Sequence, residues 1–214
     1  MAASDFGATV LVEPLRRKLA LNAPGVRLDF VNLADFTGGI AQILLRHDVF
    51  VCPRGLGLGG VFEHCPLFSD RLVCVVDQDN PRLRDGRLDF AALEDLPHAV
   101  LAFRSGVTTM IDRLMEENGV QRRVSLTATG FLPLVLAVAG SDAVTVLPER
   151  LARRFTADPR LAIADLPFPT GEMQECAWWA PARAADAGHR WFLNQLGDLA
   201  RELDVDPIGR VATG

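Results

Sequence analysis

Residues 66–76 read Pro-Leu-Phe-Ser-Asp-Arg-Leu-Val-Cys-Val-Val. The apolar run at the end of this stretch predicts a strand over 71–76, and the polar turn Asp79-Asn80-Pro81 follows it. A further apolar run extends from His98 to Phe103. We interpret this order as a strand that leaves one α/β lobe, a turn, and a strand that enters a second lobe. A crossing between two lobes leaves a cleft, and such clefts hold small ligands.

The rest of the chain alternates short apolar runs with helical patterns, which favours an α/β fold with largely parallel sheets. Two strands are candidates for crossings between lobes, 71–76 outward and 176–181 back. The first lobe would then span 1–76 plus 180–214, and the second 77–179. Trp178 and Trp179 lie on the return strand, where we expect them to pack rather than to stack on a nucleic acid.

Helical spacing predicts a first helix over 9–21, with an apolar stripe formed by Val10, Leu11, Leu15 and Leu19. A half-buried strand is expected over 26–33. Ser105 is a candidate N-cap for a helix over 107–117, and Asp186 for the last helix. We expect the stripe of the first helix to mediate dimerisation by pairing with a second-lobe helix of a partner.

Composition excludes several classes of protein. The chain has 214 residues and a formal net charge of −5, whereas nucleic-acid binders carry clustered positive charge. No apolar run is long enough to span a membrane, and no leader pattern follows Met1. The four cysteines form no C-x-x-C pair, so we expect reduced, mostly buried thiols and a cytoplasmic protein.

The sequence gives little support for a catalytic or cofactor-binding motif. The glycine-rich loop over 55–60 does not open directly into a helix, so it does not predict a phosphate site. His64 and Cys65 are adjacent, and on a strand their side chains would diverge; we expect His64 on a strand or loop surface. The sequence contains neither an H-E-x-x-H zinc pattern nor a G-x-S-x-G nucleophile elbow. We therefore expect no enzyme, no cofactor and no metal site.

Several segments together carry a family resemblance that covers nearly the whole chain. They are Ala3–Phe6, Pro24–Leu28, Leu45–Val49, Pro66–Val76 with Asn80-Pro81, Val144–Ala152 and His189–Phe192. In their order and spacing the sequence resembles the effector-binding domain of LysR-type transcriptional regulators, nearest to the branch of nodulation regulators. The loop over 55–60 is richer in glycine than the family pattern, and Leu45-Arg46-His47 replaces a typical glycine.

The resemblance implies two Rossmann-like lobes of the type 2 periplasmic-binding-protein fold, with a ligand cleft between them. It also implies a homodimer or homotetramer that senses a small effector. The family's N-terminal helix-turn-helix is absent from this sequence, so promoter DNA would be bound only through that missing segment. A stand-alone solute-binding protein is the alternative, and a small enzyme on this fold is a third hypothesis without a motif to support it.

Candidate ligand residues precede helices, where free backbone N–H groups and hydroxyls can bind a carboxylate. They are Ser4, Asp5, Phe6, Asp35, Phe36, Thr37, Arg54, Phe103, Arg104, Ser105, Gly106, Thr108, Thr129 and Phe131. Each has a structural alternative: the hydroxyls can be helix caps only, the arginines solvated charges, and the phenylalanines plain core. If several phenylalanines line the cleft, an aromatic effector is favoured over a small dicarboxylate.

Overall fold

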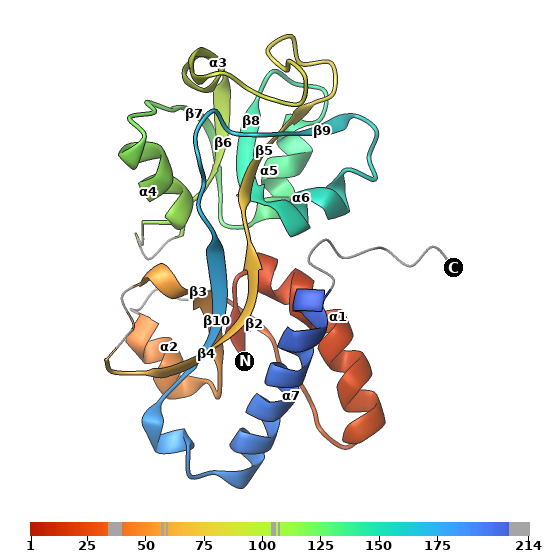
Figure 1. The fold of residues 1–214 in the computed structure, drawn as a ribbon, viewed down its shortest axis with the longest axis vertical. Coiled ribbons are helices and arrows are strands. Elements are labelled where there is room, and N and C mark those ends of the chain that lie inside the picture. Colours follow the sequence, from red (N-terminus) through yellow and green to blue (C-terminus); the bar gives the residue numbers. More distant parts are fainter. Residues whose placement is uncertain (34–39, 57, 59, 104–105, 107, 206–214) are drawn as a thin grey trace. The chain divides into compact units, whose positions relative to one another are not determined.

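The computed structural model describes residues 1–33, 40–56, 58, 60–103, 106 and 108–205 (Figure 1). It divides into two compact units, Met1–Asp70 with Met173–Gly214 (unit 1) and Arg71–Glu172 (unit 2). Each unit has one five-stranded sheet with helices packed against it. The expected α/β class is therefore confirmed.

The sheet of unit 1 has the strand order β2-β1-β3-β10-β4. Its strands are β1 (Ala2–Ala3), β2 (Val31–Asn32), β3 (Phe50–Pro53), β4 (Glu63–Asp70) and β10 (Met173–Trp179). The first three are parallel to one another, whereas β10 runs antiparallel to both β3 and β4. The C-terminal part of the chain thus completes the sheet that the first seventy residues begin.

Unit 1 contains the helices α1 (Asp5–Asn22), α2 (Ile40–Arg46) and α7 (Ala187–Val205), and the short 3₁₀ turns η2 (Arg54–Leu56) and η3 (Pro181–Arg183). Helix α1 begins four residues before the predicted start, because the Ser4 hydroxyl caps it. Asp186 accepts a hydrogen bond from the backbone N–H of His189, as expected of a cap for α7.

The apolar stripe of α1 is not available for dimerisation. Its four members, Val10, Leu11, Leu15 and Leu19, are all buried in the chain's own core. The expectation that this stripe contacts a partner is wrong, because an amphipathic helix of a small α/β unit first covers the sheet beside it.

The sheet of unit 2 has the order β7-β6-β8-β5-β9. Its strands are β5 (Leu72–Asp77), β6 (Pro97–Leu101), β7 (Arg123–Ala128), β8 (Val144–Pro148) and β9 (Leu161–Ala164). The helices of the unit are α3 (Phe90–Asp95), α4 (Met110–Glu117), α5 (Phe131–Val138) and α6 (Glu149–Phe155). Strands β6, β7 and β8 are parallel, and β5 is antiparallel to both of its neighbours.

Three local expectations differ from the structure. Helix α4 is capped by Thr109, not Ser105, through a capping box with Asp112. The strand expected over 26–33 is reduced to Val31–Asn32. The eight-residue strand β4 was not predicted as a strand of its own, because Pro66, Ser69 and Asp70 interrupt its apolar pattern.

The boundaries between the units also differ from the predicted ones. The sequence favoured 76 and 180, whereas the structure places the changes at Asp70/Arg71 and at Glu172/Met173. Among the described residues, strand β5 pairs only with strands of unit 2, and β10 only with strands of unit 1. The apolar pattern of a buried strand is the same in either sheet. The partners of such a strand therefore could not be inferred from its composition.

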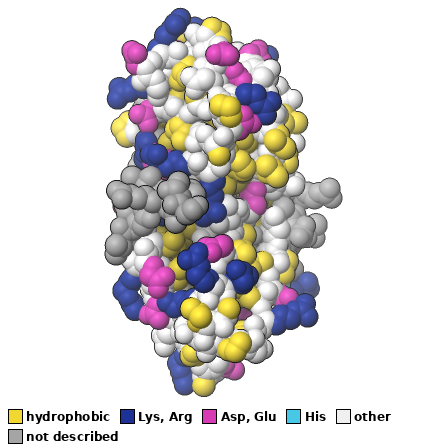
Figure 2. All heavy atoms as spheres, turned by 90° about the vertical axis from the view of Figure 1, so that its right-hand side faces the viewer, with side chains coloured by type: hydrophobic (Ala, Val, Ile, Leu, Met, Phe, Trp, Pro, Cys, Tyr) yellow, Lys and Arg dark blue, Asp and Glu magenta, His cyan; other side chains and the backbone are white. Residues whose placement is uncertain are grey.

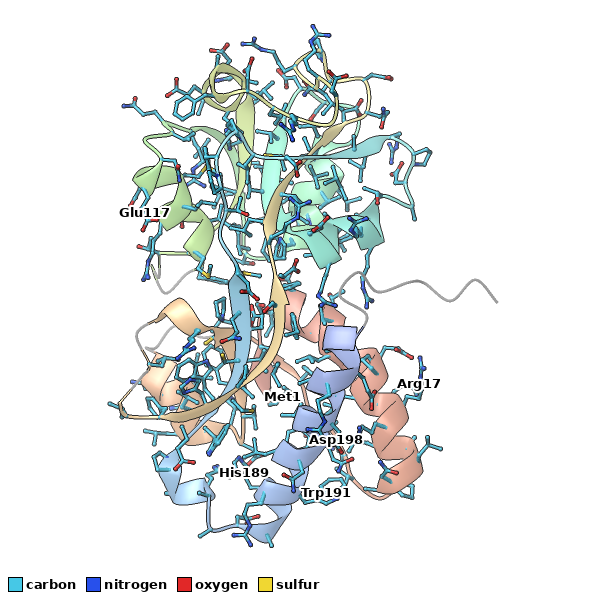
Figure 3. The ribbon with its side chains drawn as sticks, in the orientation of Figure 1. Met1, Arg17, Glu117, His189, Trp191 and Asp198 are labelled. Carbon is cyan, nitrogen blue, oxygen red and sulfur yellow. The ribbon has the colours of Figure 1, made fainter. Side chains whose placement is uncertain are left out.

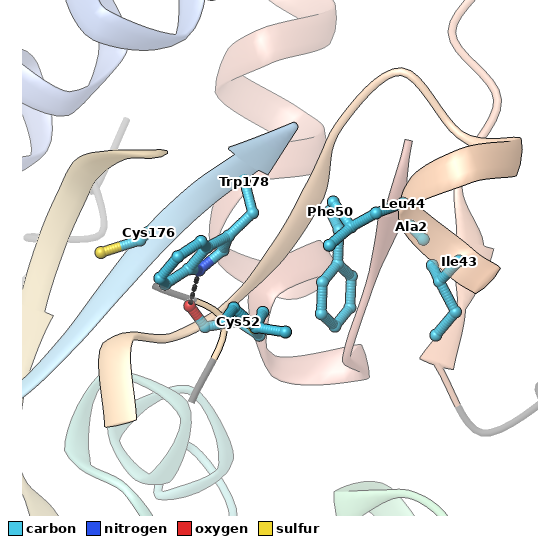
Figure 4. Packing of buried hydrophobic residues seen from close by; sticks show 8 residues of the cluster. Ala2, Ile43, Leu44, Phe50, Cys52, Cys176 and Trp178 are labelled. Carbon is cyan, nitrogen blue, oxygen red and sulfur yellow. Dashed lines mark hydrogen bonds between the residues drawn. The ribbon is translucent and has the colours of Figure 1, made fainter. Parts of the chain in front are cut away.

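A cluster of buried side chains from β1, α2, β3 and β10 forms part of the core of unit 1, and Trp178 lies within it (Figure 4). Trp178 and Trp179 are both buried, which confirms that they pack. No helix in the described part of the chain is long and apolar enough to cross a bilayer.

Candidate ligand-binding site

The parallel strands of unit 1 bring several predicted residues to one edge of the sheet. Ala3 of β1 lies opposite Val51 of β3, so both strands end at the same side. Ser4 and Asp5 follow β1 directly, and Arg54 follows β3. Ligands of open α/β sheets bind outside the carboxyl ends of the strands. This edge of unit 1 is therefore the first part of the candidate site.

Ser4 and Phe6 already have structural roles at this edge. The Ser4 hydroxyl accepts a hydrogen bond of 3.1 Å from the backbone N–H of Gly7, so it is a helix cap. The Phe6 ring is buried and makes an edge-to-face contact with Phe68 at 5.9 Å. The Asp5 carboxylate accepts a hydrogen bond of 3.0 Å from the Phe6 N–H. Any ligand contact by these three residues stays a prediction.

Arg54 is the exposed positive charge of this edge. Its guanidinium has no hydrogen-bond or ion-pair partner among the residues that the structure describes. It lies close enough to Cys176 to oppose the rise that burial and Glu175 cause in the pKa of that thiol, which is nevertheless raised to about 11. Arg54 is thus free to bind an anion.

Unit 2 gathers its predicted residues in the same way. Leu101 of β6 lies opposite Ala128 of β7 in parallel register, so the segments that follow these strands share one edge. Phe103, Gly106 and Thr108 follow β6, and Thr129 and Phe131 follow β7.

The side chains of these residues differ in their exposure to solvent. Thr108 and Thr129 are exposed, Phe103 is half-buried, and Phe131 is buried as the first residue of α5. Gly106 has φ +69°, in the left-handed region that favours glycine. Asp35, Phe36, Thr37, Arg104 and Ser105 lie outside the described residues.

Sequence reasoning missed one residue of the unit 1 edge, Glu175 on β10. Its side chain is 1% exposed, and its Oε2 atom has no hydrogen-bond partner in the part of the chain that the structure describes. Burial, assisted by the nearby Asp70, raises the pKa of this carboxyl to about 8. The available signal was the lone glutamate within an apolar strand, since glutamate is almost never fully buried without a partner.

The cysteines and His64 form no reactive site. All four thiols are free, and burial raises the pKa of each. They are protonated at neutral pH, and a thiol in that form is a poor nucleophile. His64 is exposed on β4, as expected, and its ring stacks on Trp178 with 4.4 Å between centroids. Over the described residues no group of histidine, cysteine, aspartate and glutamate side chains could hold a metal ion.

Unit 1 also contains a cavity of about 370 Å³ that the sequence did not predict, lined among others by Met1, His189 and Trp191 (Figure 3). Two ion pairs lie around it, Arg27 with Asp29 and Arg183 with Asp48. The His189 Nε2 donates a hydrogen bond of 2.9 Å to the Asp48 carbonyl. A ligand in this cavity would have to compete with these pairs.

The family model for the LysR substrate binding domain matches residues 1–201. The chain belongs to this family. Among curated relatives, the LysR domain is 27% identical over 208 residues to Nodulation protein D of Rhizobium leguminosarum bv. trifolii, covering 94% of this chain and 63% of the relative. It is 28% identical over 201 residues to Nodulation protein D 3 of R. leguminosarum bv. phaseoli, covering 93% of this chain and 65% of the relative. The domain thus spans less than two thirds of the length of these relatives.

Solved structures share the fold of this LysR domain. A probable transcriptional regulator of Pseudomonas aeruginosa has a TM-score of 0.81 and 27% identity, over 92% of this chain and 65% of that one. The regulatory domain of CcmR from Synechocystis, in complex with 2-PG, has a TM-score of 0.79 and 16% identity, over 95% and 97% of the two chains. The expected periplasmic-binding-protein-like fold is confirmed.

Proposed function

We propose that this chain is the effector-sensing and oligomerisation domain of a LysR-type transcriptional regulator, and that it binds a small aromatic or carboxylate ligand. The match of the LysR substrate binding domain to residues 1–201 carries this proposal. The candidate residues support it, because the topology gathers them at the carboxyl edges of both sheets. The relatives favour a regulator over a stand-alone solute-binding protein.

Its action would be binding rather than catalysis. A ligand that binds one arrangement of the domain more tightly than another shifts the population toward the first. In the full regulator this shift would reorient DNA-binding segments that lie outside this chain. The net charge of −5 agrees with a domain that does not itself bind DNA. We infer a cytoplasmic location, where such a regulator meets promoter DNA.

Oligomerisation would use unit 2. Leu132 and Leu136 lie one turn apart on α5 and are 52% and 63% exposed. Val124 and Leu126 are exposed on β7, the edge strand against which α5 packs. Figure 2 views unit 2 from the side opposite to β7, and there hydrophobic side chains lie among charged ones. We propose that these four residues, the α5–β7 surface, contact a second copy of the chain, since exposed apolar patches mark interaction sites.

A thermal-shift screen tests ligand binding. Aromatic carboxylates and flavonoid-like compounds are added to the wild-type chain, to Arg54→Gln, and to Arg16→Gln as a matched control. Arg16 is an exposed arginine of α1, away from the carboxyl edge of the sheet. We expect a ligand that raises the Tm of wild type and of Arg16→Gln but raises that of Arg54→Gln by less than half as much. A panel without any Tm shift would contradict the proposed function, and equal shifts in all three would contradict the site.

A further inference from the structure

Glu175 is the most unusual polar group in unit 1. A buried polar atom without a partner is destabilising, and a native structure holds few of them. The Oε2 of Glu175 is such an atom within the described chain. The described residues therefore leave this oxygen available to a partner on a bound molecule.

Glu175 lies at the carboxyl edge of the unit 1 sheet. In the antiparallel pairing of β10 with β3 it is opposite Pro53, the last residue before Arg54. The pairing of β10 with β4 shifts register between Glu175 and Cys176. Such irregularities are over-represented next to binding sites, where they redirect a side chain. Arg54 is therefore one residue beyond the position on β3 that pairs with Glu175.

Burial, assisted by a nearby negative charge, raises the pKa of Glu175 and keeps its carboxyl neutral. On β4, Asp70 adds negative charge, and the thiols of Cys52 on β3 and Cys176 on β10 are close enough to respond to the Glu175 carboxyl. Arg54 acts on Cys176, and it is not among the groups that shift the pKa of Glu175. With a pKa of about 8, the carboxyl holds its proton at neutral pH. A protonated carboxyl is a hydrogen-bond donor as well as an acceptor.

We propose that Glu175 donates a hydrogen bond from its protonated carboxyl to an oxygen of a bound carboxylate ligand, and that Arg54, which follows the residue opposite Glu175, supplies positive charge to the same ligand. This inference rests on the proposed function and names the ligand class of that site. A neutral carboxyl does not repel an anion, and an O–H···O⁻ hydrogen bond is among the stronger ones in proteins. An apolar environment that keeps a carboxyl neutral at pH 7 so that it can donate is known from enzyme sites.

The pH dependence of binding follows from this role. A carboxylate ligand favours the protonated form of Glu175, so it binds with constant affinity while that form prevails. Above a pH of about 8 the free protein loses this proton, and the ligand must restore it. Affinity then falls, up to about tenfold for each further pH unit. A ligand that donated its own proton to an ionised Glu175 would show the opposite slope.

The test measures benzoate binding to the full chain by NMR titration at pH 6.5, 8 and 9.5, a range in which benzoate is ionised throughout. We expect the Kd to rise about tenfold or more between pH 6.5 and 9.5. Glu175→Gln keeps a neutral donor, so its Kd should stay within about threefold of the wild-type value at pH 6.5 and change little with pH. Glu172→Gln removes an exposed carboxyl nearby in sequence and should keep the wild-type profile.

A ¹³C titration of the Glu175 carboxyl in the wild-type chain tests the same point without a substitution. We expect added benzoate to shift its protonation midpoint to higher pH. A Kd that is independent of pH, a Kd that falls as pH rises, or a midpoint that benzoate leaves unchanged would overturn the inference. If benzoate does not bind while uncharged compounds of the thermal-shift panel do, the carboxylate assignment fails and the proposed function stands. If nothing in the panel binds, the proposed function fails as well.

Discussion

The indole Nε1 of Trp178 donates a hydrogen bond to the backbone carbonyl of Cys52, 3.3 Å away (Figure 4). This bond joins β10, the last strand in the described part of the chain, to β3, which precedes it by more than a hundred residues. Trp178 is also one of the largest fully buried side chains. The residue therefore ties the two sequence segments of unit 1 together.

Replacement of Trp178 should destabilise unit 1. Trp178→Ala removes a large buried ring, and we expect a loss of about 3–5 kcal/mol in the free energy of unfolding. Trp178→Phe keeps most of the volume but not the hydrogen bond, and should cost about 1–3 kcal/mol. Trp191, which is half-buried on α7, offers the matched control Trp191→Phe. Urea unfolding measures all three, and a loss below about 1 kcal/mol for Trp178→Ala would contradict this role.

The alternation of elements along the chain could be predicted from local pattern alone. Most helices and strands were placed correctly, because apolar spacing is a local property. The pairing of strands was not predictable in this way. The run that forms β5 is apolar throughout, and nothing in it indicates that its partners are β8 and β9. The boundaries of the two units consequently differ from the predicted ones.

In the candidate site, too, features set by the local sequence were predictable, whereas features set by distant strands were not. Residues that follow strands could be named from the sequence, and the structure gathers Ser4, Asp5 and Arg54 at one edge. Glu175 could not be assigned a role, since its burial depends on strands more than a hundred residues away. The cap of α4 was misplaced because Ser105 and Thr109 are both suitable residue types, and only the contact with Asp112 distinguishes them.

Thr109 and Thr108 are adjacent in sequence but should respond differently to substitution. The Thr109 hydroxyl accepts a hydrogen bond of 3.0 Å from the Asp112 N–H, so Thr109→Ala should cost about 0.5–2 kcal/mol of stability. Thr108 is exposed, so Thr108→Ala should leave the Tm within about 1 °C and weaken ligand binding instead. Circular dichroism melting with and without the screened ligand separates the two effects. Equal melting temperatures for both variants would contradict the capping role.

Glu175 should make stability fall as pH rises. In the unfolded chain its carboxyl ionises near the ordinary pKa of 4.5, whereas in the folded chain the pKa is about 8. Between these values the folded chain holds a proton that the unfolded chain has lost, so the free energy of unfolding falls by up to about 1.4 kcal/mol per pH unit. Above about 8 this contribution levels off.

His98 titrates in part of the same range with the opposite sign, because burial lowers its pKa. The informative quantity is therefore the difference between wild type and Glu175→Gln. Urea unfolding from pH 5 to 9 measures the free energy of unfolding of each variant. As pH falls, wild type should gain stability relative to Glu175→Gln, while Glu172→Gln follows wild type. Parallel curves for wild type and Glu175→Gln would mean that Glu175 ionises normally in the folded chain.

Self-association should depend on the α5–β7 surface and not on α1. The stripe of α1 is buried, whereas Leu136 of α5 is 63% exposed. Burial of a leucine in an interface contributes about 1.5–3 kcal/mol, so Leu136→Asp should raise the dimer dissociation constant about tenfold or more. Leu45 of α2 is 70% exposed in unit 1, and Leu45→Asp, which adds the same charge, should leave the constant unchanged. Sedimentation equilibrium over a range of concentrations measures each constant. A wild-type chain that remains monomeric at every concentration, or equal constants for the two variants, would exclude this surface as the contact between copies.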